Sequence, residues 1–511
     1  MSENKRIAKN TLLLYLRSII VMLVTLYTSR VVLKVLGVDD FGVYNVVGSL
    51  VVMFSLMSSS LVNTSSRFIT FELGRNNFDE LKRTVNGSIT IHILLGIIVV
   101  IVAEIVGTWV LNYKMNIPAD RIIAANWVFQ CSLLSFFFNL ISTPYNALIV
   151  SHEKMNVYAY ISILEVSLRL LAVFLLSRIL FDKLIVYALL ILSISILLRI
   201  IYQIYCKVHF PESRKIKLKV DSGLFKQLFS FTGWEMIGSG AGILRNQGID
   251  ILLNLFFGVV INAAKGIANQ VQAAVYSFVS NFQMAINPQI TKNYAANNYQ
   301  RVHSLIKQGS RFSFYLFLIL SMPIILETKI VLNIWLVKVP DYSVVFVRLT
   351  FISLLIDTFY RFMVVAVAAT GNIKNYQIVV GGIKLLALPL TYLFLKLGGN
   401  PTTGLLVVIF LEVVCFFINL HFVKTMIKFD SVDFLNNIVL KSLYILIIAS
   451  ILPLIIKFYL VEINQYVYLS IITLVSLLSC GLSIYYFGLL RTEKLKAKSL
   501  IIKQIKQFKR I

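Results

Sequence analysis

The sequence predicts an all-α polytopic membrane protein with about 14 transmembrane helices, and three features of its composition indicate this class. Of its 511 residues, 58% are hydrophobic and only 14% are charged, and the mean hydropathy is +0.83. Water-soluble domains average roughly 45–50% apolar and about 25% charged residues. Because one bilayer crossing needs about 20 apolar residues, the roughly 296 hydrophobic residues are enough for about 14 or 15 helices.

The net charge of the chain is +25, because 48 lysines and arginines outnumber 23 acidic residues. In a soluble protein this excess would suggest a nucleic-acid partner. In a membrane protein the excess is expected in cytoplasmic loops, where lysine and arginine accumulate. We therefore expect no nucleic-acid partner, and only the basic residues within the spans need a functional explanation.

The first apolar segment is predicted to be a retained helix. Lys5, Arg6 and Lys9 precede it, as basic residues precede the apolar core of a signal peptide. The segment is too long for such a core, however, and it contains Arg17 and lacks an obvious small-residue cleavage site.

A hydropathy window of about 19 residues places the expected spans in three groups. The first six lie at 10–36, 43–65, 87–111, 122–146, 158–181 and 184–206. The next six lie at 229–257, 265–290, 309–336, 342–370, 377–397 and 401–424, and two more lie at 437–459 and 465–490. The expected domains are an N-terminal six-helix bundle, a basic cytoplasmic linker, a C-terminal six-helix bundle, two additional helices and a basic amphipathic tail, at residues 1–206, 207–228, 229–426, 427–490 and 491–511.

Lysine and arginine are concentrated in alternate connections between the spans, chiefly in the stretch 207–226 and the tail 491–510. By the positive-inside rule both termini are expected in the cytoplasm, which agrees with an even number of spans. The tail carries apolar residues at helical spacing among its lysines. It is expected to lie on the anionic inner leaflet.

The chain repeats itself with an offset near 221 residues. The repeat is carried by three turns, namely 76–78 with 297–299, Gly37 with Gly258, and 151–157 with 370–376. Because six spans are an even number, the two repeats are expected to face the same way, related by an axis along the membrane normal. Two such bundles around a central cavity are the architecture of an alternating-access transporter.

Span seven contains an unusual number of glycines, Gly233, Gly238, Gly240, Gly242 and Gly248. This enrichment indicates either a bend in the helix or close packing of a neighbouring helix through small residues.

Many ionisable residues fall within the expected spans, where each costs at least about 2.5–3.5 kcal/mol on insertion scales. They are Arg17, Arg30, Glu104, Glu165, Arg169, Arg199, Glu235, Arg245, Asp250, Arg348, Asp357, Arg361, Lys384 and Glu412. Glu165 with Arg169 and Asp357 with Arg361 stand four residues apart, so each pair can neutralise itself on one helical face. Arg199 and Glu235 lie near the cytoplasmic ends of their spans, from which their side chains can reach the interface. The remaining residues are expected to face a partner or a wet cavity.

Arg245 and Arg30 are the strongest candidates for the cavity, because they occupy near-equivalent places in the first spans of the two repeats. Asp250 lies five residues after Arg245, which is poor spacing for a local pair. Counting the residues without an obvious partner predicts a cationic cavity for an anionic substrate, since guanidinium groups hold phosphate with two parallel hydrogen bonds. The predicted substrate-binding residues are Arg30, Arg245, Arg17, Arg348, Arg361 and Lys384.

Asp250 and Asp357 are candidates for coupling transport to a proton or sodium gradient, with a structural ion pair as the equally supported alternative for each. The four cysteines stand singly, without CxxC or metal-ligand spacing. There is no Gly-rich phosphate loop, HExxH motif or nucleophile elbow. We therefore expect no catalytic residues, no metal site and no cofactor.

Several stretches resemble the bacterial polysaccharide exporters, or O-antigen flippases, of the multidrug/oligosaccharidyl-lipid/polysaccharide (MOP) exporter superfamily. They are 9–11 (KNT), 36–44 (LGVDDFGVY), 248–254 (GIDILLN), 266–271 (GIANQV) and 287–290 (NPQI). The resemblance spans almost the whole chain, including the plan of six, six and two helices. It implies transfer of an undecaprenyl-diphosphate-linked oligosaccharide from the cytoplasmic to the outer leaflet of the bacterial inner membrane. It also implies that the last two helices help to accommodate the lipid. With this function, docking of the basic tail to a glycan polymerase or assembly protein is the less favoured alternative to its lying on the membrane.

Two other functions compete with this one. A multidrug antiporter of the same superfamily usually has twelve spans and an acidic cavity, whereas this chain is expected to have about 14 spans and a basic interior. A membrane glycan polymerase or glycosyltransferase would carry a large outside loop or a cytoplasmic domain with paired carboxylates, and the expected outside loops here are short and poor in Asp and Glu.

Overall fold

The computed structural model describes residues 3–52, 55–113, 117–176, 178, 180–214, 222–336, 339–459, 464–491 and 493–495. Residues 215–221 of the predicted linker, and the predicted tail from residue 496 onward, lie outside the described residues. The described part is helical, and it contains no β-strand. The predicted all-α class is therefore confirmed.

Fifteen of the α-helices have eight or more residues. They are α1 (Glu3–Val52), α2 (Ser55–Arg75), α3 (Phe78–Tyr113), α4 (Ile122–Ser151), α5 (Met155–Leu176), α6 (Lys183–His209), α7 (Ser222–Phe257), α8 (Val259–Ala295), α9 (Tyr299–Leu326), α10 (Thr328–Trp335), α11 (Ser343–Thr370), α12 (Lys374–Lys396), α13 (Thr403–Ile427), α15 (Lys441–Tyr459) and α16 (Gln465–Ser483). A four-residue turn, α14 (Ser431–Phe434), precedes α15. Among the described residues, 10 helical segments are long and apolar enough to cross a membrane.

The other predicted spans lie in α1, α2, α7 and α8. α1 contains the first span and the start of the second. The two are separated by a kink at Gly37, whose φ of 80° and ψ of 172° are not helical. Because a left-handed backbone is strained for residues with a side chain, glycine suits this predicted outside turn.

The predicted repeat is visible in the backbone of its turns. Gly37 and Gly258 have φ values of 80° and 77°, and Asn76 and Asn297 have φ values of 53° and 57°. Each of these asparagines follows a helix that ends with the same pair of backbone hydrogen bonds, and the next asparagine side chain accepts from the backbone N–H three residues on. Turns 221 residues apart in the sequence are thus built alike.

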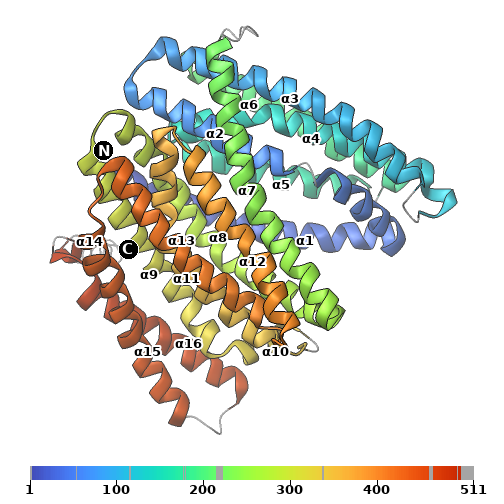
Figure 1. Ribbon diagram of the computed structural model, residues 1–511. Helices are drawn as coiled ribbons and strands as arrows, with labels where there is room; N and C mark the ends of the chain where they lie inside the picture. Colours follow the sequence, from blue (N-terminus) through green and yellow to red (C-terminus); the bar gives the residue numbers. More distant parts are fainter. Residues whose placement is uncertain are drawn as a thin grey trace, which may run out of the picture. The chain divides into compact units, whose positions relative to one another are not determined.

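One compact unit contains residues 1–242, 284–302 and 365–381. Its packing centre is α4, which contacts α1, α2, α3 and α6, and α3 and α6 both run along it (Figure 1). Phe129, Tyr145 and Leu148 of α4 are almost completely buried. The first six helices therefore pack around a central apolar helix.

The second compact unit contains residues 243–283, 303–364 and 382–511. Its core is formed by buried aromatic and small side chains such as Phe317, Phe346 and Ala268. α15 packs against α16 (Figure 1), and Lys457 of α15 reaches Glu327 at the end of α9, with Nζ 2.9 Å from Oε1. The last two helices are therefore attached to this unit by an ion pair whose carboxylate is buried.

Helices α7, α8, α9, α11 and α12 each run through both units. The glycine-rich α7 is one continuous helix and does not break. Two of its glycines lie at close approaches. A Cβ atom at Gly238 would lie 1.8 Å from Gln377 Oε1, and one at Gly248 would lie 2.4 Å from Leu388 Cδ2. Of the two explanations for the glycines, close packing therefore holds at these two positions.

Candidate functional site

Seven ionisable side chains on five helices of the second unit form the candidate site, which we name the charged cluster. Its members are Arg245 and Asp250 of α7, Lys265 of α8, Asp357 and Arg361 of α11, Lys384 of α12 and Glu412 of α13. Four members are basic and three are acidic, so the cluster carries one net positive charge. It contains five of the eight side chains that the sequence predicted for substrate binding or ion coupling.

Arg245 is held by a partner distant in the sequence. Its Nη1 lies 2.5 Å from Oε1 of Glu412, and the two side chains are only 14% and 6% exposed. Tyr360 donates its hydroxyl proton to the other oxygen of the same carboxylate. Counting Arg245 and Glu412 as unpaired was therefore wrong, because the partner comes from another helix and not from a neighbouring turn.

Asp357 is the second carboxylate that contacts both a tyrosine hydroxyl and a cation. The hydroxyl of Tyr276 donates to its Oδ2 over 2.7 Å, and Nε of Arg361 lies 3.8 Å from the same oxygen. The predicted pair four residues apart is thus present, although it is long. The predicted pair of Glu165 with Arg169 in the first unit is also confirmed, at 2.6 Å.

Arg361 and Lys384 are the basic groups of the charged cluster that keep most of their hydrogen-bonding capacity. Arg361 exposes 45% of its side chain. Lys384 is half-buried, and among the described residues it has no hydrogen-bond acceptor and no carboxylate within ion-pair distance. The charges of Glu412, Arg245 and Arg361 act on it. An ammonium group in this position can bind an anion without breaking a protein contact.

Lys265 belongs to the cluster, although the sequence analysis did not include it. Its Nζ donates to Asn269 Oδ1 over 2.9 Å, and it interacts electrostatically with Asp250 and Arg245. The predicted span began at Lys265, whereas α8 begins at Val259. The turn at Gly258 could have shown this, because its equivalent at Gly37 also stands directly before a helix.

Asp250 lies beside Lys265 in an incompletely satisfied position. Its Oδ1 is buried and accepts no hydrogen bond from the described residues. A buried carboxylate oxygen without a donor is costly, and a proton or a small cation would lower that cost. Among the described residues, no three His, Cys, Asp or Glu side chains are grouped so that they could hold a metal ion.

The other predicted binding residues lie apart from the charged cluster. Arg17 belongs to the first unit, where it donates to Ser162 Oγ over 3.3 Å and lies 4.9 Å from the centre of the Tyr158 ring. The side chain of Arg30 lies outside the described residues. Arg348 belongs to the second unit, where it donates to the backbone oxygens of Ile325 and Leu326.

Arg348 binds the last carbonyl groups of α9, which have no partner within that helix. We expect Arg348→Met to lower stability by about 1–2 kcal/mol, because these carbonyl groups lose a charged donor and keep only Thr328 Oγ1 and Lys457 Nζ as donors. Thermal unfolding in detergent measures this effect. A variant of normal stability that no longer binds the predicted anionic substrate would instead support the predicted substrate-binding role.

A second group of polar contacts lies within the first unit and joins its N-terminal helices to the ends of α8 and α11. The carboxylate of Glu153 is buried and lies 2.8 Å from Lys292 Nζ, and it also accepts from Gln289. Arg67 Nη2 donates to the backbone oxygen of Ala369 over 2.9 Å. These contacts connect segments from both halves of the chain.

Solved structures of transporters share this fold. A mutant of a MATE protein is 11% identical, with a TM-score of 0.73, and the alignment covers 84% of this chain and 98% of that chain. An outward-facing multidrug resistance MATE transporter of the MOP superfamily gives 11% identity, a TM-score of 0.72 and coverage of 84% and 96%. A MOP superfamily transporter from Pyrococcus furiosus is 11% identical, with a TM-score of 0.70 and coverage of 84% and 96%. It is described as having a binding pocket of reverse polarity that suggests a different function.

These similarities define the class of the protein, which is a multi-pass membrane protein with the fold of the MOP superfamily transporters. The family model described as "Polysaccharide biosynthesis protein" matches residues 7–296, more than half of the 511 residues. The chain therefore belongs to the polysaccharide biosynthesis protein family. No curated protein matches its sequence.

Proposed function

We propose that this protein is a flippase for polyprenyl-diphosphate-linked oligosaccharides, the repeat units of O-antigen, capsule or exopolysaccharide. It moves them from the cytoplasmic to the outer leaflet of the bacterial inner membrane by alternating access, and both of its termini are cytoplasmic. The family supports a role in polysaccharide synthesis, and the fold supports transport. The proposal requires a site for a diphosphate within the helices.

The observation that carries the proposal is the net positive charge of the charged cluster. Lys384 has no carboxylate partner among the described residues, and Arg361 exposes almost half of its side chain. A phosphate group between them would gain charge-assisted hydrogen bonds. Arg245 would complete the site from α7, and Arg17, Arg30 and Arg348 are the further candidates that the sequence names.

Asp250 and Asp357 are the candidate sites for ion coupling. Binding of a proton or sodium ion to either carboxylate would make the charged cluster more positive and favour the diphosphate. Its release would weaken the substrate site again, so that the ion gradient can drive the cycle. The polar contacts around Glu153 would open and close as part of the same cycle.

Lys384→Ala is the test of the substrate site. In a strain from which the gene is deleted, we expect this variant to restore less than about a tenth of the surface polysaccharide, because a charged hydrogen bond to the diphosphate contributes about 1.5–3 kcal/mol. Lipid-linked repeat units should accumulate in the membrane. The measurements are surface glycan and extracted lipid-linked units, at matched protein levels.

The matched control is Lys396→Ala, which removes an exposed lysine from the end of the same helix and should restore export fully. The competing function, supported by the multidrug resistance MATE neighbour, predicts another phenotype. Normal surface glycan in the deletion strain, with heightened sensitivity to cationic drugs, would replace the flippase with a multidrug antiporter.

A further inference from the structure

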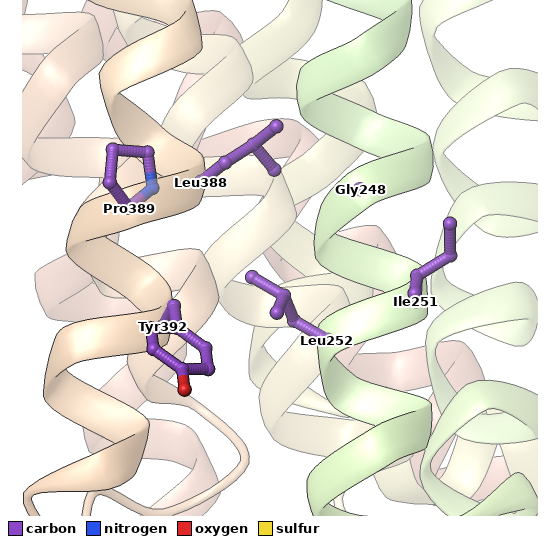
Figure 2. Close-up of a pocket in the computed structure, with 6 residues that line it drawn as sticks. All are labelled: Gly248, Ile251, Leu252, Leu388, Pro389 and Tyr392. Carbon is purple, nitrogen blue, oxygen red and sulfur yellow. The ribbon is translucent and has the colours of Figure 1, made fainter.

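An apolar crevice lies between the C-terminal halves of α7 and α12 in the second unit (Figure 2). Its volume is about 340 Å³, within the roughly 300–1,000 Å³ that is typical of ligand pockets. Ile251 and Tyr392 are 59% and 47% exposed, so the crevice is open at its side. It is lined by Gly248, Ile251, Leu252, Leu388, Pro389 and Tyr392.

The shape of the crevice follows from one glycine and one proline. Leu388 points toward Gly248 (Figure 2), where a side chain would leave no space for it. α7 and α12 therefore approach closely at this level. Pro389 lies inside α12 and cannot donate a helical hydrogen bond. Beyond it, Tyr392 meets Phe256 edge-on, with ring centres 5.9 Å apart.

Basic groups stand at one end of this apolar surface. Arg245 precedes Gly248 by three residues and Lys384 precedes Leu388 by four, so each lies one helical turn from the crevice on the same face. The two cations also act on each other electrostatically. The same two helices thus present an apolar surface followed by a cationic one, which matches an amphiphile with an anionic head.

We propose that this crevice binds the isoprenoid units next to the diphosphate of the lipid-linked substrate. Arg245 and Lys384 hold the diphosphate, and the first isoprenoid units lie between Leu252 and Tyr392. This inference rests on the proposed function and goes beyond it, because it places part of the lipid against α7 and α12 and not only against the last two helices. A diphosphate carries more negative charge than a phosphodiester, which favours it over an ordinary phospholipid beside Lys384 and Arg245. Arg245 is shared with Glu412, whereas Lys384 has no such ion pair among the described residues.

The test is binding of undecaprenyl diphosphate to the purified full-length protein in lipid nanodiscs. We expect Leu252→Trp, which fills the crevice, to weaken binding at least about tenfold, because the displaced chain loses several buried carbon atoms. Leu386→Trp is the matched control. It makes the same substitution at an exposed position of α12 that does not line the crevice, and it should bind like the wild type.

A second measurement uses only the wild-type protein and does not depend on how a variant folds. Farnesyl diphosphate, with three isoprene units, should displace undecaprenyl diphosphate at a concentration at least about tenfold lower than inorganic diphosphate does. If inorganic diphosphate competes as well as farnesyl diphosphate does, the isoprenoid chain contributes nothing to the binding affinity. That result would overturn the inference.

The remaining outcomes separate the inference from the proposed function. Normal binding by Leu252→Trp, together with export that requires Lys384, would leave the flippase standing and overturn the crevice. Phosphatidylglycerol that binds as tightly as undecaprenyl diphosphate, with the same sensitivity to Leu252→Trp, would make the crevice an ordinary lipid site. If the wild type does not bind undecaprenyl diphosphate and deletion leaves surface glycan normal, both proposals fail.

Discussion

The Arg245→Met variant is expected to unfold at a lower temperature than the wild type and to export almost no polysaccharide. Glu412 is only 6% exposed, and the substitution leaves its carboxylate with the hydroxyl of Tyr360 as a hydrogen-bond donor but without its cation. Removing one partner from a buried ion pair typically costs about 3–5 kcal/mol. Thermal unfolding in detergent measures the stability, and surface glycan in the complemented deletion strain measures export.

A double variant separates the two roles of Arg245. Arg245→Met combined with Glu412→Gln removes both charges and keeps an oxygen that can accept from Tyr360. Replacing a buried ion pair by neutral groups is often close to neutral for stability, so we expect most of the stability to return. Export should stay low, because the cation near the substrate site is still missing. Recovery of both properties would make Arg245 purely structural.

The helices of this protein could be predicted from sequence because each span produces its own signal. Apolar runs of about 20 residues have few alternatives to a membrane helix, and the turns at Gly37 and Gly258 need a left-handed backbone that glycine adopts easily. The exact start of α8 was missed by six residues. Polar residues near the start of α8 lower its hydropathy, and the window then excluded residues 259–264, which left Lys265 at the very start of the predicted span.

The sequence could predict most members of the charged cluster, but it could not predict which of them contact one another. Pairs on one helix, such as Glu165 with Arg169, follow from a spacing of four residues. The partners Arg245 and Glu412 are 167 residues apart, and nothing local in the sequence connects them. For Arg348, the sequence could not predict the contacts of the side chain. Its position inside a span indicated a functional charge, whereas its acceptors are backbone oxygens at the end of α9, which sequence patterns do not reveal.

A second large effect is expected at Gly74 of α2, where the first unit brings two backbones together. A Cβ atom there would lie 2.5 Å from the backbone oxygen of Lys292 and 2.7 Å from its Cα. A backbone cannot move aside as a side chain can, so Gly74→Ala must push α2 and α8 apart. Overpacking of this kind costs about 1–3 kcal/mol. Because Lys292 also holds the buried carboxylate of Glu153, the substitution should loosen that ion pair as well.

If the contact between α2 and α8 closes one side of the transporter during its cycle, the cost of overpacking in Gly74→Ala should lower the ratio of closed to open molecules. A cost of about 1–3 kcal/mol corresponds to a decrease of roughly 5- to 150-fold. Ser151 is completely buried beside Thr70, so a Ser151→Cys substitution should react slowly with maleimide in an otherwise wild-type protein. The reaction should be several-fold faster with Gly74→Ala, and export should fall. Gly240→Ala is the matched control. It adds the same methyl group to α7, and the added Cβ atom would have no atom of a neighbouring element within 4 Å. If the Gly74→Ala and Gly240→Ala variants show equal maleimide reactivity and equal export, the contact between α2 and α8 is structural. A contact that closes the transporter would expose the buried position 151 when it is weakened.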